Sequence, residues 1–116
     1  MSYSYKNLVE LFNSDKDFKV NTLSCLFLQD VHQKLIYSYS TIIAVIDTNS
    51  NNCYIVDKKY SATTSKQQGL LRRLQGTAFN NVYTVSMDKI LEKFTNLSIE
   101  DFAMNKVYDY GEFLGR

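Results

Sequence analysis

A β-hairpin pattern in the middle of the chain places the strongest constraint on its fold. Residues 36–47 are rich in Tyr, Ile, Thr and Val, which suit a half-buried pleated strand. The polar cluster at 48–52 contains three Asn residues, and Asn tolerates the left-handed backbone angles of tight turns. Residues 53–60 then alternate between two faces, with Cys53 on one and Tyr54 on the other. Two antiparallel strands joined by a short turn are therefore predicted.

Two segments outside this hairpin have the spacing of amphipathic helices. The apolar face of the first consists of Tyr5, Leu8, Val9 and Phe12. The apolar face of the second consists of Met87, Ile90, Leu91 and Phe94. Ser86 precedes the second segment and is suited to cap its N-terminus.

A further helix is predicted directly after the hairpin. Thr64 is its expected N-cap, and Gln67 stands three residues later, as in a capping box. Leu70, Leu71 and Leu74 supply the apolar stripe, and Gly76 is the expected stop. Lys66 and Arg73 fall on a different face from the leucines.

The remaining segments are less regular. Residues 20–28 fit a strand or a buried helical turn, and residues 82–85 fit a third strand. Ser98 resembles another capped helix start. The predicted fold is α+β, with a small antiparallel sheet around the hairpin and three to four short helices on one face. At 116 residues, the chain is expected to form a single domain spanning 1–116.

Charge is unevenly distributed along the chain. The net charge is only +1, which argues against a uniformly basic nucleic-acid coat or an acidic DNA mimic. Between positions 57 and 76, however, there are five cations and one anion. This pattern predicts one cationic surface, although a solvated helix face would have the same composition.

Few residues have the pattern of a catalytic or metal site. Cys25 and Cys53 have no CxxC spacing, and His32 is the single histidine. Cys25 precedes His32 by seven positions, but its apolar surroundings favour an inert core thiol. Glu100 and Asp101 fit a helix start. No phosphate-binding glycine motif is present. We therefore expect no catalytic residue, no metal and no cofactor.

Two short elements could bind a ligand or serve the fold alone. Hydroxyls at 63–65 with Lys66 could receive a phosphate at a helix start, yet capping requires the same residues. Tyr54 and Tyr60 beside Lys58 could stack bases, yet half-buried sheets commonly contain tyrosine.

Composition also bears on origin and location. The first residues lack the apolar run of a secretory signal, and the stretch 42–46 is too short to cross a bilayer. We expect free thiols in the cytoplasm of a bacterial host. The abundance of Asn, Lys, Tyr and Ile, whose codons are AT-rich, fits an AT-rich bacterium or its phage.

Residues 37–74 resemble a family of small uncharacterised proteins encoded by phages and other mobile elements. The resemblance rests on the strand at 39–44 and on the run at 59–66, which follows the form Tyr-Ser-x-Thr-Thr-Ser-Lys. Gln67 stands where that family often has histidine, so a histidine-dependent role is not expected. The resemblance implies a phage-encoded binding protein, with anti-CRISPR inhibitors as one such class.

The predicted function is non-enzymatic binding that inhibits or modulates a host protein or ribonucleoprotein complex, a CRISPR effector being one candidate. The predicted contact residues are Lys58, Lys59, Tyr60, Thr64, Ser65, Lys66, Arg72 and Arg73. A nucleic-acid-binding accessory protein that uses the same basic 58–73 face is the alternative. An enzyme with a dispersed site is a third hypothesis. An exposed hairpin edge could also allow homodimerisation by strand pairing.

Overall fold

A single mixed sheet organises the protein in the computed structural model, which describes residues 5–58 and 61–102. The strands lie side by side in chain order. They are β1 (Phe18–Val20), β2 (Leu23–Leu28), β3 (Gln33–Ser38), β4 (Thr41–Asp47), β5 (Asn52–Val56) and β6 (Asn81–Val85). The first five strands pair antiparallel, whereas β6 pairs parallel with β5.

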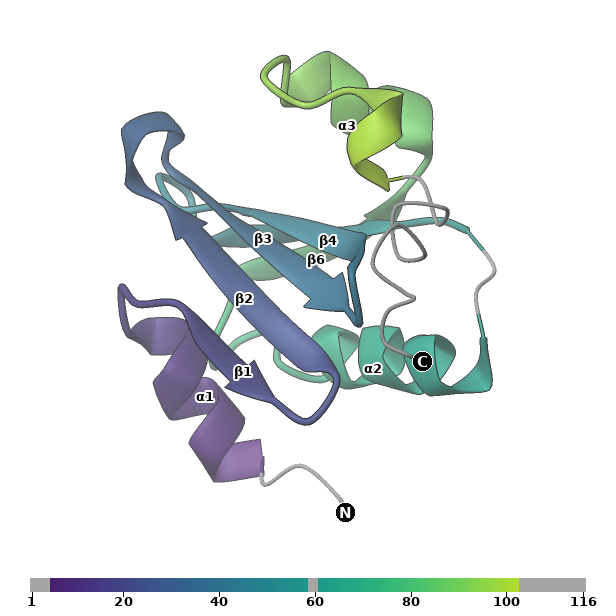
Figure 1. Cartoon of the computed structure of the whole chain (residues 1–116). Coiled ribbons are helices and arrows are strands. Elements are labelled where there is room, and N and C mark those ends of the chain that lie inside the picture. The colour runs from purple at the N-terminus through teal and green to yellow at the C-terminus, as the bar shows by residue number, and fades with distance from the viewer. Residues whose placement is uncertain (1–4, 59–60, 103–116) are drawn as a thin grey trace.

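Helices cover both faces of this sheet (Figure 1). The α-helices are α1 (Tyr5–Asn13), α2 (Ala62–Arg72) and α3 (Met87–Lys93), and the short 3-10 helices are η1 (Gln29–Val31) and η2 (Ile99–Phe102). One core cluster joins Phe12 of α1 and Leu71 of α2 to the sheet. The other joins Ile90 of α3 and Phe102 of η2 to the opposite face.

The α+β class is confirmed, but two finer predictions about the sheet are wrong. The sheet is larger than a hairpin and is not wholly antiparallel, because α2 forms a crossover that returns β6 beside β5 in the same direction. The helices are not confined to one face. The sequence contains a pattern that agrees with this arrangement, because residues 42–46 are consecutively apolar. All five are buried in the structure. Such a run is typical of a strand covered on both sides.

The predicted hairpin is present, with altered bounds. β4 and β5 pair around a turn at 48–51, but residues 36–47 do not form one strand. The chain turns back at Tyr39, whose φ is 59° and whose N–H donates to the Thr22 carbonyl at 2.7 Å. This turn was not predicted, because the residues around it are mostly ones that favour strands.

Because β4 and β5 both lie inside the sheet, the hairpin has no free edge, and the edges of the sheet are β1 and β6.

Several local predictions are confirmed. Residues 23–28 adopt the strand alternative as β2, but Asn21 and Thr22 form a turn that separates β2 from β1, so 20–28 is not one strand. β6 includes the predicted strand at 82–85. The Ser86 hydroxyl accepts the Lys89 N–H at 3.3 Å and caps α3. The helix start at Ser98 leads into η2, where the Asp101 carboxylate accepts the Ser98 N–H at 2.8 Å.

Candidate macromolecule-binding face on helix α2

Helix α2 begins earlier than its sequence pattern predicted. Its N-cap is Ser61, whose backbone is extended and whose hydroxyl accepts the Thr64 N–H at 3.3 Å. The predicted Thr64 cap is therefore wrong, and Gln67 does not close a capping box, because its amide donates to the Thr22 hydroxyl instead. Ser61 and the hydroxyl residues at 63–65 are all suited to cap a helix, so the sequence alone does not distinguish them. In the structure Thr64 contacts β3, and Ser61 is the cap.

The inner face of α2 is unusually polar, and its polar side chains are used inside the fold. Thr64 is only 6% exposed, and its hydroxyl lies 2.9 Å from the Ser38 hydroxyl of β3. The buried Gln68 amide donates to the Val56 carbonyl at 3.1 Å and to the Ile43 carbonyl at 3.4 Å. These contacts hold α2 in one position against β3, β4 and β5. Thr64 is therefore a structural residue, although it was predicted to contact a partner.

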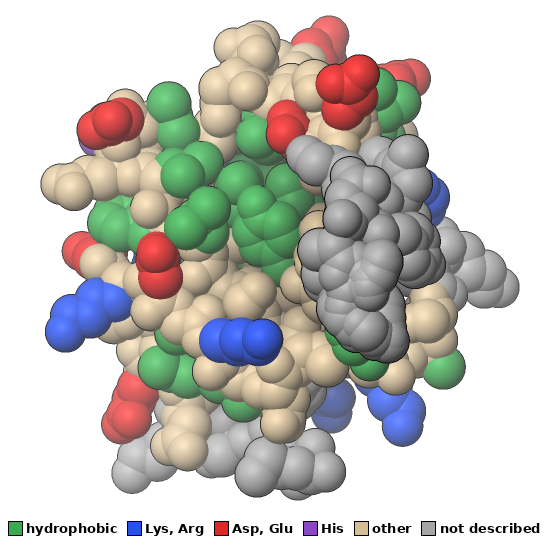
Figure 2. All heavy atoms as spheres, in the orientation of Figure 1, with side chains coloured by type: hydrophobic (Ala, Val, Ile, Leu, Met, Phe, Trp, Pro, Cys, Tyr) green, Lys and Arg blue, Asp and Glu red, His purple; other side chains and the backbone are tan. Residues whose placement is uncertain are grey.

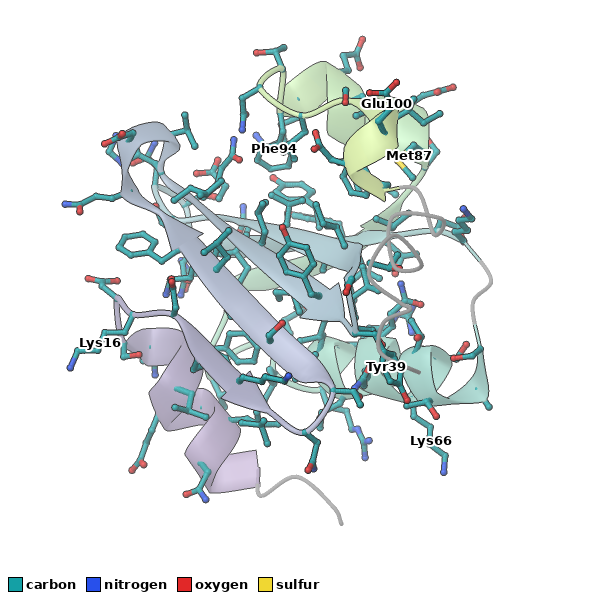
Figure 3. The ribbon with its side chains drawn as sticks, viewed as in Figure 1. Lys16, Tyr39, Lys66, Met87, Phe94 and Glu100 are labelled. Atoms are coloured by element: carbon teal, nitrogen blue, oxygen red, sulfur yellow. The ribbon has the colours of Figure 1, made fainter. Side chains whose placement is uncertain are left out.

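The outer face of α2 is exposed and positively charged. We call Lys66, Arg72 and Arg73, together with Lys58 just before the helix, the basic face. All four are exposed, and α2 contains no acidic residue. Figure 3 shows Lys66 pointing away from the sheet.

One end of the basic face is anchored to the sheet. The Arg72 guanidinium donates through Nε to the Thr84 hydroxyl of β6 at 3.1 Å, so its position at this edge is restrained. Ser65 is exposed beside these cations. Lys59 and Tyr60, also predicted as contact residues, lie outside the described residues.

An aromatic cluster on the other face of the sheet was only partly foreseen. Tyr54 was expected beside Lys58 and Tyr60. In the structure it stacks on Tyr83 of the neighbouring strand, with ring centroids 5.4 Å apart. The Lys93 ammonium lies 5.2 Å from the Tyr54 ring centroid and forms an ion pair with Asp47 at 3.6 Å. Only the β5–β6 pairing brings Tyr54 and Tyr83 together, so no local pattern could have revealed this contact.

None of the residues considered as catalytic candidates, Cys25, Cys53, His32 and Asp101, lies in an arrangement that would activate it within the described part of the chain. Burial raises the pKa of the Cys25 thiol to about 12, which keeps it protonated and poorly nucleophilic near neutral pH. Burial also raises the pKa of Cys53. His32 is exposed in a left-handed turn, with φ of 56°. Asp101 accepts hydrogen bonds from Ser98.

Within the two described stretches, no three His, Cys, Asp or Glu residues gather as a metal site. No helix in the same part of the chain is long and apolar enough to cross a membrane.

Comparison with known proteins identifies a family but not an activity. Residues 6–81 match the model of a family of unknown function, DUF8033. The chain belongs to this family. The match includes all of α1 but its first residue, the first five strands and α2, and it ends at the first residue of β6. The basic face therefore lies inside the family region, whereas α3 and η2 follow it. No curated protein and no solved structure matches the chain.

Proposed function

We propose that this DUF8033 protein is a non-enzymatic binding protein that holds an anionic surface of a macromolecular partner with its basic face. The observation that carries the proposal is the contrast between the two sides of α2. The inner side engages the sheet through Thr64 and Gln68, whereas the outer side presents Lys66, Arg72 and Arg73 with no acidic residue in the helix. Folding accounts for the inner residues, whereas the outer cations are exposed at the surface, where an anionic partner can reach them.

The partner we propose is a protein or ribonucleoprotein complex of a bacterial host, bound by a phage-encoded protein. Support comes from the resemblance of the Tyr-Ser-x-Thr-Thr-Ser-Lys run to proteins of phages and mobile elements, and from the hydrogen bond that restrains Arg72 at one end of the basic face. An inhibitor gains affinity when its contact residues are positioned before binding. A CRISPR effector, whose surface includes anionic guide RNA, is one complex of the required chemistry.

Nucleic-acid binding is the second candidate, and the stacked pair of Tyr54 and Tyr83 favours it. Tyr83 is 44% exposed at the β6 edge, and the Lys93 ammonium lies 5.2 Å from the centroid of the Tyr54 ring on the same face of the sheet. Exposed aromatic rings next to cations can stack the bases of a single strand while the cations bind its phosphates.

The test is capture of partners from a bacterial host lysate, with and without nuclease treatment. The bait is compared with a triple variant, Lys66→Glu, Arg72→Glu and Arg73→Glu. A control reverses two exposed lysines elsewhere in the chain, Lys16→Glu and Lys89→Glu. Thermal unfolding of each variant establishes that the fold is retained.

We expect one stoichiometric complex that survives nuclease, is lost with the triple variant and is kept by the control. Capture that disappears with nuclease, and affinity for single-stranded RNA or DNA that falls steeply with salt, would favour the second candidate. If the triple variant retains every partner, the basic face is not the binding surface.

A further inference from the structure

The sheet face beneath α3 is covered only in part. One row of side chains crosses this face from β2 to β6 and consists of Leu26, Leu35, Val45, Tyr54 and Tyr83, each paired in register with the next. Leu35 and Val45 in the middle are buried beneath α3 and η2. Leu26 at the β2 end remains 37% exposed. The helices therefore leave part of the β1–β3 half of this face open, around Leu26.

A groove of about 560 Å³ occupies the open half. Its lining includes Lys19 of β1, Ser24 and Leu26 of β2, Tyr37 of β3 and Tyr39 of the following turn. Tyr39 is 57% exposed, and Figure 2 shows hydrophobic side chains gathered over β2 and β3 on the face turned to the viewer. An exposed apolar groove with a polar rim is typical of a binding site, for a protein segment or for another ligand.

The chain itself passes close to this groove. Phe102 is the last described residue, and it is buried in the cluster under α3 together with Leu35 of β3. The preceding Asp101 carboxylate lies near enough to Tyr37 to add to the rise in the pKa of that phenol, which burial mainly causes. Tyr37 lines the groove, so the chain continues from a point beside it.

The continuing sequence has the composition to fill an apolar groove. Fourteen residues follow Phe102, and their apolar members are Ala103, Met104, Val107, Tyr108, Tyr110, Phe113 and Leu114. Fully extended at roughly 3.3 Å per residue, they could reach about 46 Å. The longest axis of the molecule is 37 Å, so their length is sufficient to span the groove.

We propose that the groove between β1 and the β3–β4 turn is the docking site for residues 103–116 of the same chain. Apolar side chains of this segment would cover Leu26, Tyr37 and Tyr39, and so complete the layer that α3 and η2 begin. The proposal concerns the sheet face opposite α2 and is independent of the basic face.

A nitroxide attached to a Leu114→Cys variant of the full-length chain tests this docking. Cys25 and Cys53 are buried, at 3% and 0% exposed, so the added cysteine can be labelled selectively. We expect loss of the amide signals of Leu26, Tyr37 and Tyr39 in spectra of the isotope-labelled protein, while those of α2 persist. Leu26→Asp should restore the groove signals. The control Tyr83→Asp, at the far end of the same row, should leave the loss unchanged.

Two results would overturn the proposal. One is broadening that is uniform or falls on another surface. The other is broadening that vanishes when the isotope-labelled, spin-labelled chain is diluted with unlabelled protein, because the groove would then hold a second copy. Backbone spectra of Leu26→Asp establish whether this variant is folded. If it is not, Tyr39→Lys in the exposed turn replaces it with the same expectation.

Discussion

The Lys34 ammonium of β3 donates a hydrogen bond to the main-chain oxygen of Phe12, 2.7 Å away at the end of α1. A second bond reaches the Ser14 oxygen at 3.0 Å. Lys34 is only 5% exposed, so a charged residue inside the sheet serves as the C-terminal cap of a helix distant in sequence. A cation at the C-terminal end of a helix is favourable because the last carbonyl oxygens carry a partial negative charge. This contact ties α1 to the sheet.

Replacing Lys34 by methionine should destabilise the protein. Lys34→Met keeps most of the side-chain volume but removes the donor from the Phe12 and Ser14 carbonyls. We expect a loss of roughly 1–3 kcal/mol in the free energy of unfolding, because a buried acceptor without a donor is costly. Urea denaturation measures this change. Lys89→Met, at an exposed position on α3, is the control. Equal losses in the two variants would contradict the capping role.

Gln68 should also be important for stability. Ile43 is left out of the β3–β4 register, where the pairing shifts, and its carbonyl accepts from the Gln68 amide at 3.4 Å. Gln68→Leu would remove this donor and the bond to Val56. We expect a loss of roughly 1–3 kcal/mol in the free energy of unfolding and faster hydrogen exchange at the end of β5. Ser65→Ala, on the exposed side of α2, should change stability little. A fully stable Gln68→Leu variant would show that the bonds are dispensable.

The β6 edge is protected by a side chain. The Val82 N–H donates to the Gln75 side-chain oxygen at 3.0 Å, so a donor on this edge is already occupied. Gln75→Ala should expose it and promote strand pairing between copies, since open edges favour association. Sedimentation at increasing protein concentration should reveal a larger dimer fraction than in the native chain. Gln29→Ala, an exposed substitution in η1, is the control. Identical sedimentation of Gln75→Ala and the native chain would argue against this protective role.

The raised pKa of Cys25 predicts both reactivity and pH dependence. Near pH 8 the native thiol should react with iodoacetamide far more slowly than the unfolded thiol, because it is buried and protonated. The unfolded thiol ionises near the ordinary cysteine pKa of 9.0, whereas the folded one ionises near 12. The folded state therefore binds more protons in that range, and this contribution to stability is lost as pH rises from about 9 to about 12.

Denaturation across this pH range should show a shallower decline for Cys25→Ala than for the native chain. The difference isolates Cys25 from the tyrosines and lysines, which also titrate there. Parallel pH profiles for the two proteins, or native alkylation as fast as in denaturant, would contradict the inferred environment of Cys25.

Local signals were sufficient for several parts of the fold. The spacing of Leu8 and Phe12 predicted α1, and Ser86 before Met87 predicted the start of α3. Each depends on residues within about two turns, where side-chain spacing and capping act directly. The same is true of the turn between β4 and β5. The basic outer face of α2 was predicted for this reason as well, because helical periodicity separates Lys66 and Arg73 from the leucines.

Tertiary structure decided what depends on partners far away in sequence. The parallel pairing of β6 with β5, the burial of Lys34 and the stacking of Tyr54 on Tyr83 each join segments that no local pattern links. Thr64 illustrates the same limit. Its hydroxyl looked like a helix cap in the sequence, but the fold places it against Ser38, 26 positions away. A polar side chain can satisfy its hydrogen bonds locally or across the core, and only the packed structure selects between these alternatives.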